Sequence, residues 1–249
     1  MLRLIQTDQI DEYPQQWIDL PHGADYQQAL QKQIDPWLTK IFGFHLLKLG
    51  QLSIELDTQR CPIHHQINMA NAGQNLHVWA DHQHLPLAHK TIDACLLAHL
   101  LPFEHNPYQI LREVDRILVD DGWLILSSFN LLSVLGLGKL VPVLKSTLPY
   151  SSNMFTELRL LDWLALLNYE VLYHSNFQVL PKHSHIESFL TTHFPVLGCL
   201  NVIIARKRTI PLTLDPLQKH KLRLHFGRKI TGTVNTYDQC KTNDRYKKQ

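Results

Sequence analysis

Apolar residues follow two different spacings between residues 91 and 130 of this chain. Residues 91–97 (TIDACLL) are a short apolar run with β-branched members, which predicts a strand buried on both faces of a parallel sheet. A helix is expected next, because Asn106 can cap it and Pro107 is well tolerated at its first position. Residues 123–128 (WLILSS) then predict a second buried strand. The apolar face of the helix between them is formed by residues at helical spacing: Ile110, Leu111, Val114, Ile117 and Leu118.

A strand, a helix and a strand of these lengths predict a parallel pair with a right-handed crossover. Gly122 is placed to end the helix in a left-handed conformation. Upstream, residues 44–50 predict the first strand, and residues 67–70 and 76–80 predict two more. The turn-forming residues 71–73 (NAG) and the short gap between these two strands favour a hairpin.

Helical patterns precede and follow this region. Residues 24–34 predict a helix, which Asp35 and Pro36 end while they begin a second helix that stops at Gly43. Residues 156–168 predict a further helix, and the last two strands are expected at 170–173 and 198–206. We therefore expect a helical lead-in (residues 1–43) and an α/β domain (residues 44–216), followed by a tail (residues 217–249).

The composition changes this picture little. With 45% hydrophobic and 18% charged residues among 249, the chain is typical of a globular protein, and no apolar run reaches the ~18 residues that span a bilayer. The N-terminus has no signal-peptide pattern, so we expect a cytoplasmic location. The four cysteines are scattered and the histidine pairs His82/His84 and His183/His185 have no obvious third ligand, so we expect no metal. Hydrolase and nucleoside triphosphatase motifs are missing.

Charge is unevenly spread along the chain. Residues 217–249 contain nine Lys and Arg against two acidic residues, a local net charge of +7, while residues 1–216 carry −5. A basic tail can bind nucleic acid or anionic lipid, or it can be a solvated extension. Both interpretations stay open.

Residues 85–101 (LPLAHKTIDACLLAHLL) and 106–130 (NPYQILREVDRILVDDGWLILSSFN) resemble the second half of a class I S-adenosylmethionine-dependent methyltransferase domain of type 11. Asp81 with Leu85-Pro86-Leu87 is similar to the family's acidic turn, and residues 111–118 are similar to its helix motif. The resemblance implies a Rossmann-like α/β fold, with a mostly parallel sheet, an antiparallel final strand and S-adenosylmethionine as cofactor. The chain is also similar to a little-described bacterial group of methyltransferase-like proteins.

The resemblance implies a cofactor site at Gly50, Asp81 and His82, with Ala98 at the end of a central strand. In the family the first strand ends in a glycine-rich turn, because side chains there would block the cofactor. Here Gly50 alone matches that turn, Lys48 stands where an acid is expected, and no acid clearly ends the second strand. Asp81 and His82 lie where the family contacts adenine, although Asp81 could equally form a turn.

His99 and Asn130 are the candidate catalytic residues, because ligands bind at the carboxyl ends of strands in such sheets. His99 could be a base, or it could be hydrogen-bonded to a nearby loop. Asn130 could orient an acceptor, or it could cap the helix that follows. We expect methyl transfer from S-adenosylmethionine to an acceptor that the sequence does not identify. The alternative is a catalytically degenerate relative that keeps the fold as a binding or regulatory module, which the missing glycines favour.

Overall fold

The computed structural model describes residues 13–133, 136, 148, 150, 152–177 and 198–209. All of them lie within one compact unit, Met1–Ile210. The predicted basic tail (residues 217–249) and the histidine pair His183/His185 lie outside the described residues.

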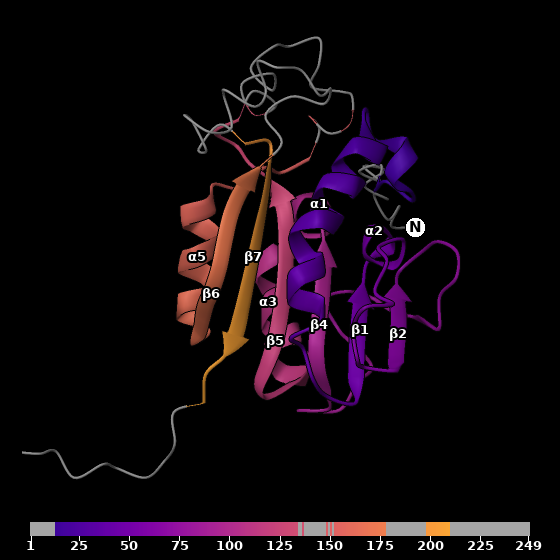
Figure 1. The fold of residues 1–249 in the computed structure, drawn as a ribbon, viewed down its shortest axis with the longest axis vertical. Helices are drawn as coiled ribbons and strands as arrows, with labels where there is room; N and C mark the ends of the chain where they lie inside the picture. The colour runs from indigo at the N-terminus through magenta and orange to yellow at the C-terminus, as the bar shows by residue number, and fades with distance from the viewer. Residues whose placement is uncertain are drawn as a thin grey trace, which may run out of the picture. The chain divides into compact units, whose positions relative to one another are not determined.

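A seven-stranded sheet forms the centre of the domain, in the order β3-β2-β1-β4-β5-β7-β6 (Figure 1). Neighbouring strands are parallel except where β7 pairs antiparallel with both β5 and β6. The expected α/β fold, with a mostly parallel sheet and an antiparallel final strand, is confirmed. The strands are β1 His45–Leu49, β2 His65–Ala70, β3 Val78–Trp79, β4 Ile92–Ala98, β5 Leu118–Phe129, β6 Tyr169–Phe177 and β7 Leu200–Lys207.

Alternate residues of the central strands point to opposite faces of the sheet. Leu46 and Leu96 belong to a core shared with α1, whereas Leu47 and Leu97 belong to a core shared with α3 and α5. Figure 1 shows α1 on one face and α3 and α5 on the other. The helices are η1 Trp17–Asp19, α1 Gly23–Leu38, α2 Gln51–Ile54, η2 Leu101–Phe103, α3 Pro107–Ile117 and α5 Glu157–Leu166.

The start of α3 agrees with the prediction, but its end does not. Asn106 is the N-cap residue and Pro107 the first helical residue, as expected. The chain passes directly from α3 into β5 at Leu118, and Gly122 lies inside that strand. The positive φ angle belongs to Asp121 (64°), because a short polar side chain tolerates this conformation. The prediction for Gly122 was therefore wrong.

Two other local predictions were also wrong. The two helices expected on either side of Asp35 are one helix, α1, in which Pro36 lies in the last turn and the buried Ile34 and Leu38 on either side of it keep the helix packed. Strands β2 and β3 are parallel and form no hairpin. The chain has positive φ angles at both Gly73 (127°) and Asn75 (57°), so it turns twice before β3 and resumes the original direction.

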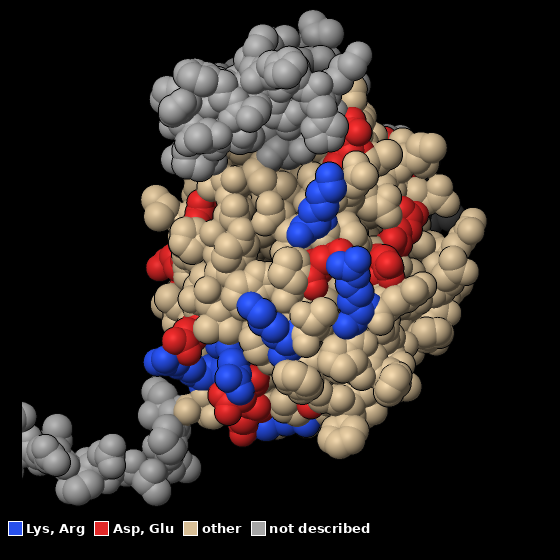
Figure 2. Space-filling view, viewed as in Figure 1, with Lys and Arg blue, Asp and Glu red and all other residues tan. Residues whose placement is uncertain are grey.

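No helix in the described part of the chain has the length and apolar character needed to cross a membrane. On the face drawn in Figure 2, Lys and Arg side chains are interspersed with Asp and Glu. The described residues of this face therefore form no extended basic surface of the kind that binds a phosphate backbone.

Candidate active site

The structure brings four of the predicted site residues to one edge of the sheet. Gly50 directly follows β1, Ala98 and His99 lie at the end of β4, and Asn130 directly follows β5. Because β1, β4 and β5 are parallel, their carboxyl ends meet at this edge. This is the edge at which open α/β sheets bind ligands.

The turn after β1 requires a residue without a side chain. Gly50 has a φ angle of 86°, and its N–H donates to the Met69 carbonyl oxygen of β2 at 2.9 Å. A Cβ atom at this position would lie 2.8 Å from the Tyr13 hydroxyl and 3.1 Å from Leu100 Cδ1. Gly50 thus keeps the backbone close to its neighbours, as a cofactor-binding turn must.

Ser53 of α2 joins the ends of β1 and β4. Its hydroxyl donates to the Leu49 carbonyl oxygen at 2.6 Å and accepts from the Ala98 N–H at 2.7 Å. The Ala98 amide is therefore occupied inside the protein. Any contact between Ala98 and a ligand must use its carbonyl group or its small side chain.

Tyr13 is a site residue that the sequence did not reveal, because residues 1–22 lack a periodic pattern. Its hydroxyl is buried, faces the N–H groups of Gln51 and Leu52 without completing a hydrogen bond, and has no partner among the described residues. Burial and the nearby Glu104 raise the pKa of Tyr13, so the phenol stays neutral. The ring packs edge-on against Phe103, with the centroids 5.5 Å apart.

The two residues predicted to contact adenine have different environments. His82 is buried, its Nδ1 lies 2.5 Å from Glu104 Oε1, and its Nε2 has no hydrogen-bond partner in the described part of the chain. Asp81 is exposed, accepts from the Gln83 N–H at 3.0 Å and lies 3.1 Å from His84 Nδ1. The Gln83 hydrogen bond, followed by that of His84, lowers the pKa of Asp81, so this carboxylate is ionised and also closes a turn.

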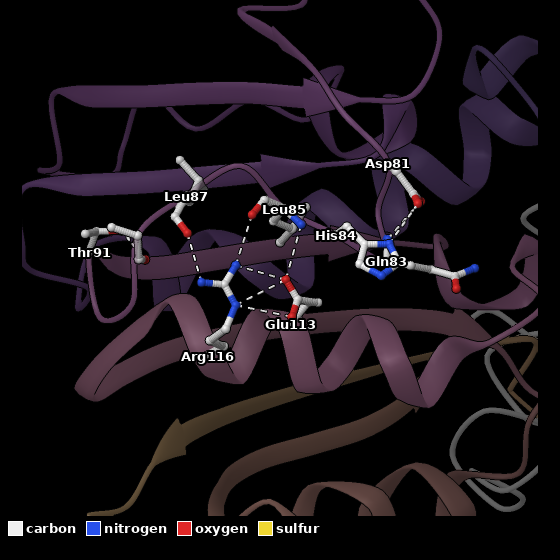
Figure 3. Close-up of polar contacts among 9 residues, drawn as sticks. Asp81, Gln83, His84, Leu85, Leu87, Thr91, Glu113 and Arg116 are labelled. Atoms are coloured by element: carbon white, nitrogen blue, oxygen red, sulfur yellow. Dashed lines mark hydrogen bonds and ion pairs between the residues drawn. The ribbon is translucent and has the colours of Figure 1, made fainter.

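Helix α3 holds this turn in place (Figure 3). Arg116 donates to the carbonyl oxygens of Leu85 and Leu87, both at 2.9 Å, while Glu113 accepts from the Leu85 N–H at 3.2 Å. Glu113 and Arg116 also bind each other at 2.9 Å. The helix motif that resembles the family thus braces the loop that follows Asp81.

His99 is completely buried beneath the edge of the sheet. Its Nδ1 lies 3.0 Å from Ser127 Oγ of β5, and its ring packs against Trp17 and Phe129 with centroids 5.2 and 4.5 Å apart. Burial lowers the pKa of His99 to about 3, so the imidazole is neutral at physiological pH. Nε2 has no partner among the described residues and can accept or donate one hydrogen bond, depending on the tautomer.

Asn130 joins two segments of the chain. Its side-chain amide donates to the Gly198 carbonyl oxygen at 2.9 Å, and its side-chain oxygen accepts from the Leu132 N–H at 3.1 Å. Its own N–H donates to the Cys199 carbonyl oxygen at 2.9 Å. The side chain therefore ties the end of β5 to the residues that precede β7.

The end of β2 lacks the acid that the family places there. Gln51 reaches across this end instead, because its Nε2 donates to the Gln74 carbonyl oxygen at 3.0 Å and its carboxamide lies where a Cβ at Gly73 would be. Gln51 Oε1 has no hydrogen-bond partner among the residues that the structure describes. Within the described part of the chain, no group of three or more metal-ligating side chains occurs.

Eight buried side-chain polar atoms have no hydrogen-bond partner among the described residues, and four of them, in Tyr13, Gln51, His82 and His99, lie around this edge of the sheet. The other four belong to Asp115, Tyr169, Asn176 and Asn201. A buried polar atom without a partner is costly, and a polar ligand is one way to satisfy it. The four atoms at this edge and the Gly50 turn fit a polar cofactor, although the Tyr13 ring has to share or leave the space beside Gly50.

Comparisons with known proteins agree with this fold. A family model described as "Methyltransferase domain" matches residues 51–126. A protein of Escherichia coli (strain K12), "Uncharacterized protein YafS", is 52% identical over 220 residues, which cover 88% of this chain and 92% of that protein.

Solved structures share the fold at low sequence identity. A "SAM dependent methyltransferase" from Archaeoglobus fulgidus is 13% identical with a TM-score of 0.54, covering 73% of this chain and 94% of that one. A "possible histamine N-methyltransferase" from Thermotoga maritima is 17% identical with a TM-score of 0.50, covering 74% and 95%. The "[4+2]-Cyclase SpnF" is 14% identical with a TM-score of 0.51, covering 74% and 83%.

The expected family and fold are confirmed, and S-adenosylmethionine is the cofactor that belongs with this type of domain. The chain belongs to the same family as YafS and carries a class I methyltransferase domain of type 11.

Proposed function

We propose that this protein binds S-adenosylmethionine at the carboxyl edge of β1 and β4 and transfers its methyl group to an acceptor. The observation that carries this proposal is the set of buried polar atoms of Tyr13, Gln51, His82 and His99 around the Gly50 turn, which have no hydrogen-bond partner among the described residues. A polar cofactor could form hydrogen bonds with these atoms. They therefore support cofactor binding, in addition to the methyltransferase fold.

The cofactor would be held by Gly50, Asp81, His82 and Ala98, together with Tyr13. Gly50 adds no side chain to the space beside the backbone, which the Tyr13 hydroxyl and Leu100 line, and Ala98 adds little bulk at the end of β4. Asp81 can accept from an amino group because it is ionised, and the brace from Arg116 fixes the loop that follows it. When bound, S-adenosylmethionine supplies an electrophilic methyl group on a sulfonium.

The protein's own contribution is mainly positioning and exclusion of water. Trp17 covers the edge of the sheet by donating from Nε1 to the Leu52 carbonyl oxygen at 3.0 Å and by packing on His99. His99 keeps its proposed role at the acceptor, but as a neutral hydrogen-bonding group, since a pKa near 3 gives it little tendency to hold a proton. Asn130 is proposed to shape the acceptor side by joining β5 to Gly198.

Calorimetric titration with S-adenosylmethionine and with its demethylated product tests cofactor binding. We expect saturable binding that weakens in Asp81→Asn and Tyr13→Phe. Asp120→Asn is a matched control, because Asp120 is also a partly exposed aspartate in an ion pair, with Lys90, but lies at the beginning of β5. An absence of heat at high ligand concentration, with the protein folded, would contradict the proposal.

A second candidate is a degenerate domain that keeps the fold without methyl transfer. It is favoured by Gln51, which spans the end of β2 where the family has an acid, and by the absence of the second and third glycines. The similarity to a [4+2]-cyclase shows that this fold also occurs in a protein named for another reaction. If the cofactor binds but no methyl group reaches any acceptor offered, this candidate gains support. The cytoplasmic location and nucleic-acid binding through residues 217–249 stay predictions from the sequence.

A further inference from the structure

A hollow opens near the edge of the sheet at which the cofactor is proposed to bind. It has a volume of about 770 Å³ and lies between the first residues of α3 and those of α5. Its lining includes Tyr108 of α3 and Phe155, Arg159 and Trp163 at or near α5. Pockets for small molecules commonly have this size. We call this hollow the α3–α5 cavity, and neither Gly50 nor Ala98 lines it.

One wall of the α3–α5 cavity is aromatic. Trp163 lies 5.2 Å from Phe155 and 6.0 Å from Tyr108, measured between ring centroids. Such a wall provides planar apolar surface on which an aromatic or aliphatic group can stack. The wall is fixed by packing, because Phe155 is buried and Trp163 packs against the core formed with α3.

Arg159 supplies a positive charge that no carboxylate among the described residues neutralises. Its guanidinium carbon lies 5.2 Å from the Trp163 centroid and 6.0 Å from the Phe155 centroid. Arg159 forms no ion pair with any described residue, and no Asp or Glu lines the cavity. A guanidinium stacked on rings keeps its edge free to bind a carboxylate or phosphate.

A second arginine, Arg206, also stacks on a tryptophan, but carboxylates lie beside it. Arg206 also lies over a tryptophan, 5.7 Å from the Trp123 centroid, in a hollow of about 420 Å³. That hollow is lined by Asp93, Asp120 and Asp121, and Arg206 donates to the Asp121 carbonyl oxygen at 3.0 Å. The charge of Arg206 is thus balanced locally, whereas no described carboxylate balances that of Arg159.

Helix α3 adds to the positive potential. It begins in the cavity, its N-cap residue Asn106 makes no side-chain capping hydrogen bond, and its first turn contains no acidic residue. The helix dipole therefore favours negative charge at this end. His84 and His105 complete a lining that can be neutral or positive but not negative.

We propose that the α3–α5 cavity binds a small anion with an aromatic or apolar body, whose carboxylate or phosphate binds Arg159 and whose body stacks on Trp163. The site goes beyond the proposed methyl transfer and does not depend on it, because none of the residues proposed to hold the cofactor (Tyr13, Gly50, Asp81, His82 and Ala98) lines the cavity. The ligand is held in the absence of S-adenosylmethionine.

Titration of the full chain with phenyl phosphate, inorganic phosphate and phenol, without cofactor, tests this proposal. Phenyl phosphate should bind saturably, inorganic phosphate more weakly, and phenol more weakly still. Arg159→Gln should weaken phenyl phosphate binding roughly tenfold or more, since a charge-assisted hydrogen bond is lost. Trp163→Leu should lower the affinity for phenyl phosphate to nearly that for inorganic phosphate.

Arg206→Gln is the matched control, since it removes an arginine stacked on a tryptophan outside the cavity. It should leave the affinity for phenyl phosphate unchanged, and thermal melting should show that all three variants fold. No saturable binding, or equal weakening by Arg159→Gln and Arg206→Gln, would overturn the proposal. Binding that Trp163→Leu leaves intact would overturn the aromatic part of it. Because no cofactor is present, failure here is distinguishable from failure of the proposed methyl transfer.

Discussion

Arg116 Nη2 lies 2.9 Å from the carbonyl oxygen of Leu85, so one side chain of α3 holds the loop that follows Asp81. The same guanidinium binds the Leu87 carbonyl oxygen and the Glu113 carboxylate. Three partners in one plane suit the forked geometry of arginine, which lysine cannot reproduce. The hydrogen bonds of Arg116 and Glu113 therefore hold the predicted adenine-binding loop in place. Substitution of Arg116 removes this brace without changing a residue that is proposed to contact the cofactor.

We expect Arg116→Lys to lower the free energy of unfolding by about 1–3 kcal/mol, because partly buried carbonyl oxygens lose their donors. Urea denaturation monitored by circular dichroism measures this loss. Arg112→Lys, one turn earlier on the exposed face of α3, should change the free energy by less than about 0.5 kcal/mol. Similar losses in both variants would mean that the brace does not stabilise the fold.

The same brace should make stability depend on pH. The hydrogen bond from Arg116, followed by smaller effects that include the Leu85 N–H, lowers the pKa of Glu113 in the folded protein. In the unfolded chain the pKa of this carboxyl is about 4.3. The unfolded state therefore binds the proton more readily, and the stabilisation is complete above that pH and is lost as the pH falls through the folded-state pKa.

Glu113→Gln isolates this contribution. Wild type should be more stable than the variant at pH 7, and the difference should shrink progressively below about pH 4.3. Urea midpoints measured between pH 3 and pH 7 report the difference directly. A difference that stays constant over this range would show that the charge of Glu113 has no part in the brace.

The sequence predicted the elements with strong periodicity and missed those fixed by distant contacts. The strand at residues 91–97 and the start of α3 at Asn106 were predicted because the apolar spacing and the cap are local signals. The direction of β3 was not, since the signal at residues 71–73 indicates one turn and the backbone makes two. Pro36 indicated a helix boundary, but packing of Leu38 against the core kept α1 continuous.

The candidate site shows the same division. Gly50, Ala98, His99 and Asn130 were expected at one edge because parallel strands place their ends together, and they lie there. Tyr13 was missed, because it comes from a segment without periodicity and its contacts are with residues far along the chain. The partners of His99 and Asn130 could not be read from the sequence either, since both lie on other elements. Their catalytic roles stay proposals.

The contact between Gly50 and Tyr13 can be tested through stability. Gly50→Ala places a Cβ 2.8 Å from the Tyr13 hydroxyl and forces a φ angle of 86° on an L-residue. We expect a loss of roughly 1–3 kcal/mol in the free energy of unfolding. In a Tyr13→Phe background the loss should be smaller, because the clashing oxygen is gone while the backbone strain remains. Equal losses in both backgrounds would place Tyr13 away from Gly50 in solution.

The buried imidazole of His99 gives the sharpest pH prediction. Its pKa of about 3 in the folded protein lies below the value of about 6.5 in an unfolded chain. Between these values the unfolded state binds an extra proton, so His99 destabilises the fold increasingly as the pH falls below 6.5 and has no such effect above it.

In His99→Gln the fall in stability between pH 7.5 and pH 4.5 should therefore be smaller than in wild type. An NMR titration of wild type gives the independent measurement: the His99 ring protons should not shift between pH 5 and pH 8. A midpoint near 6.5 for those protons would show that the ring is accessible to solvent, and it would restore His99 as a proton-accepting base.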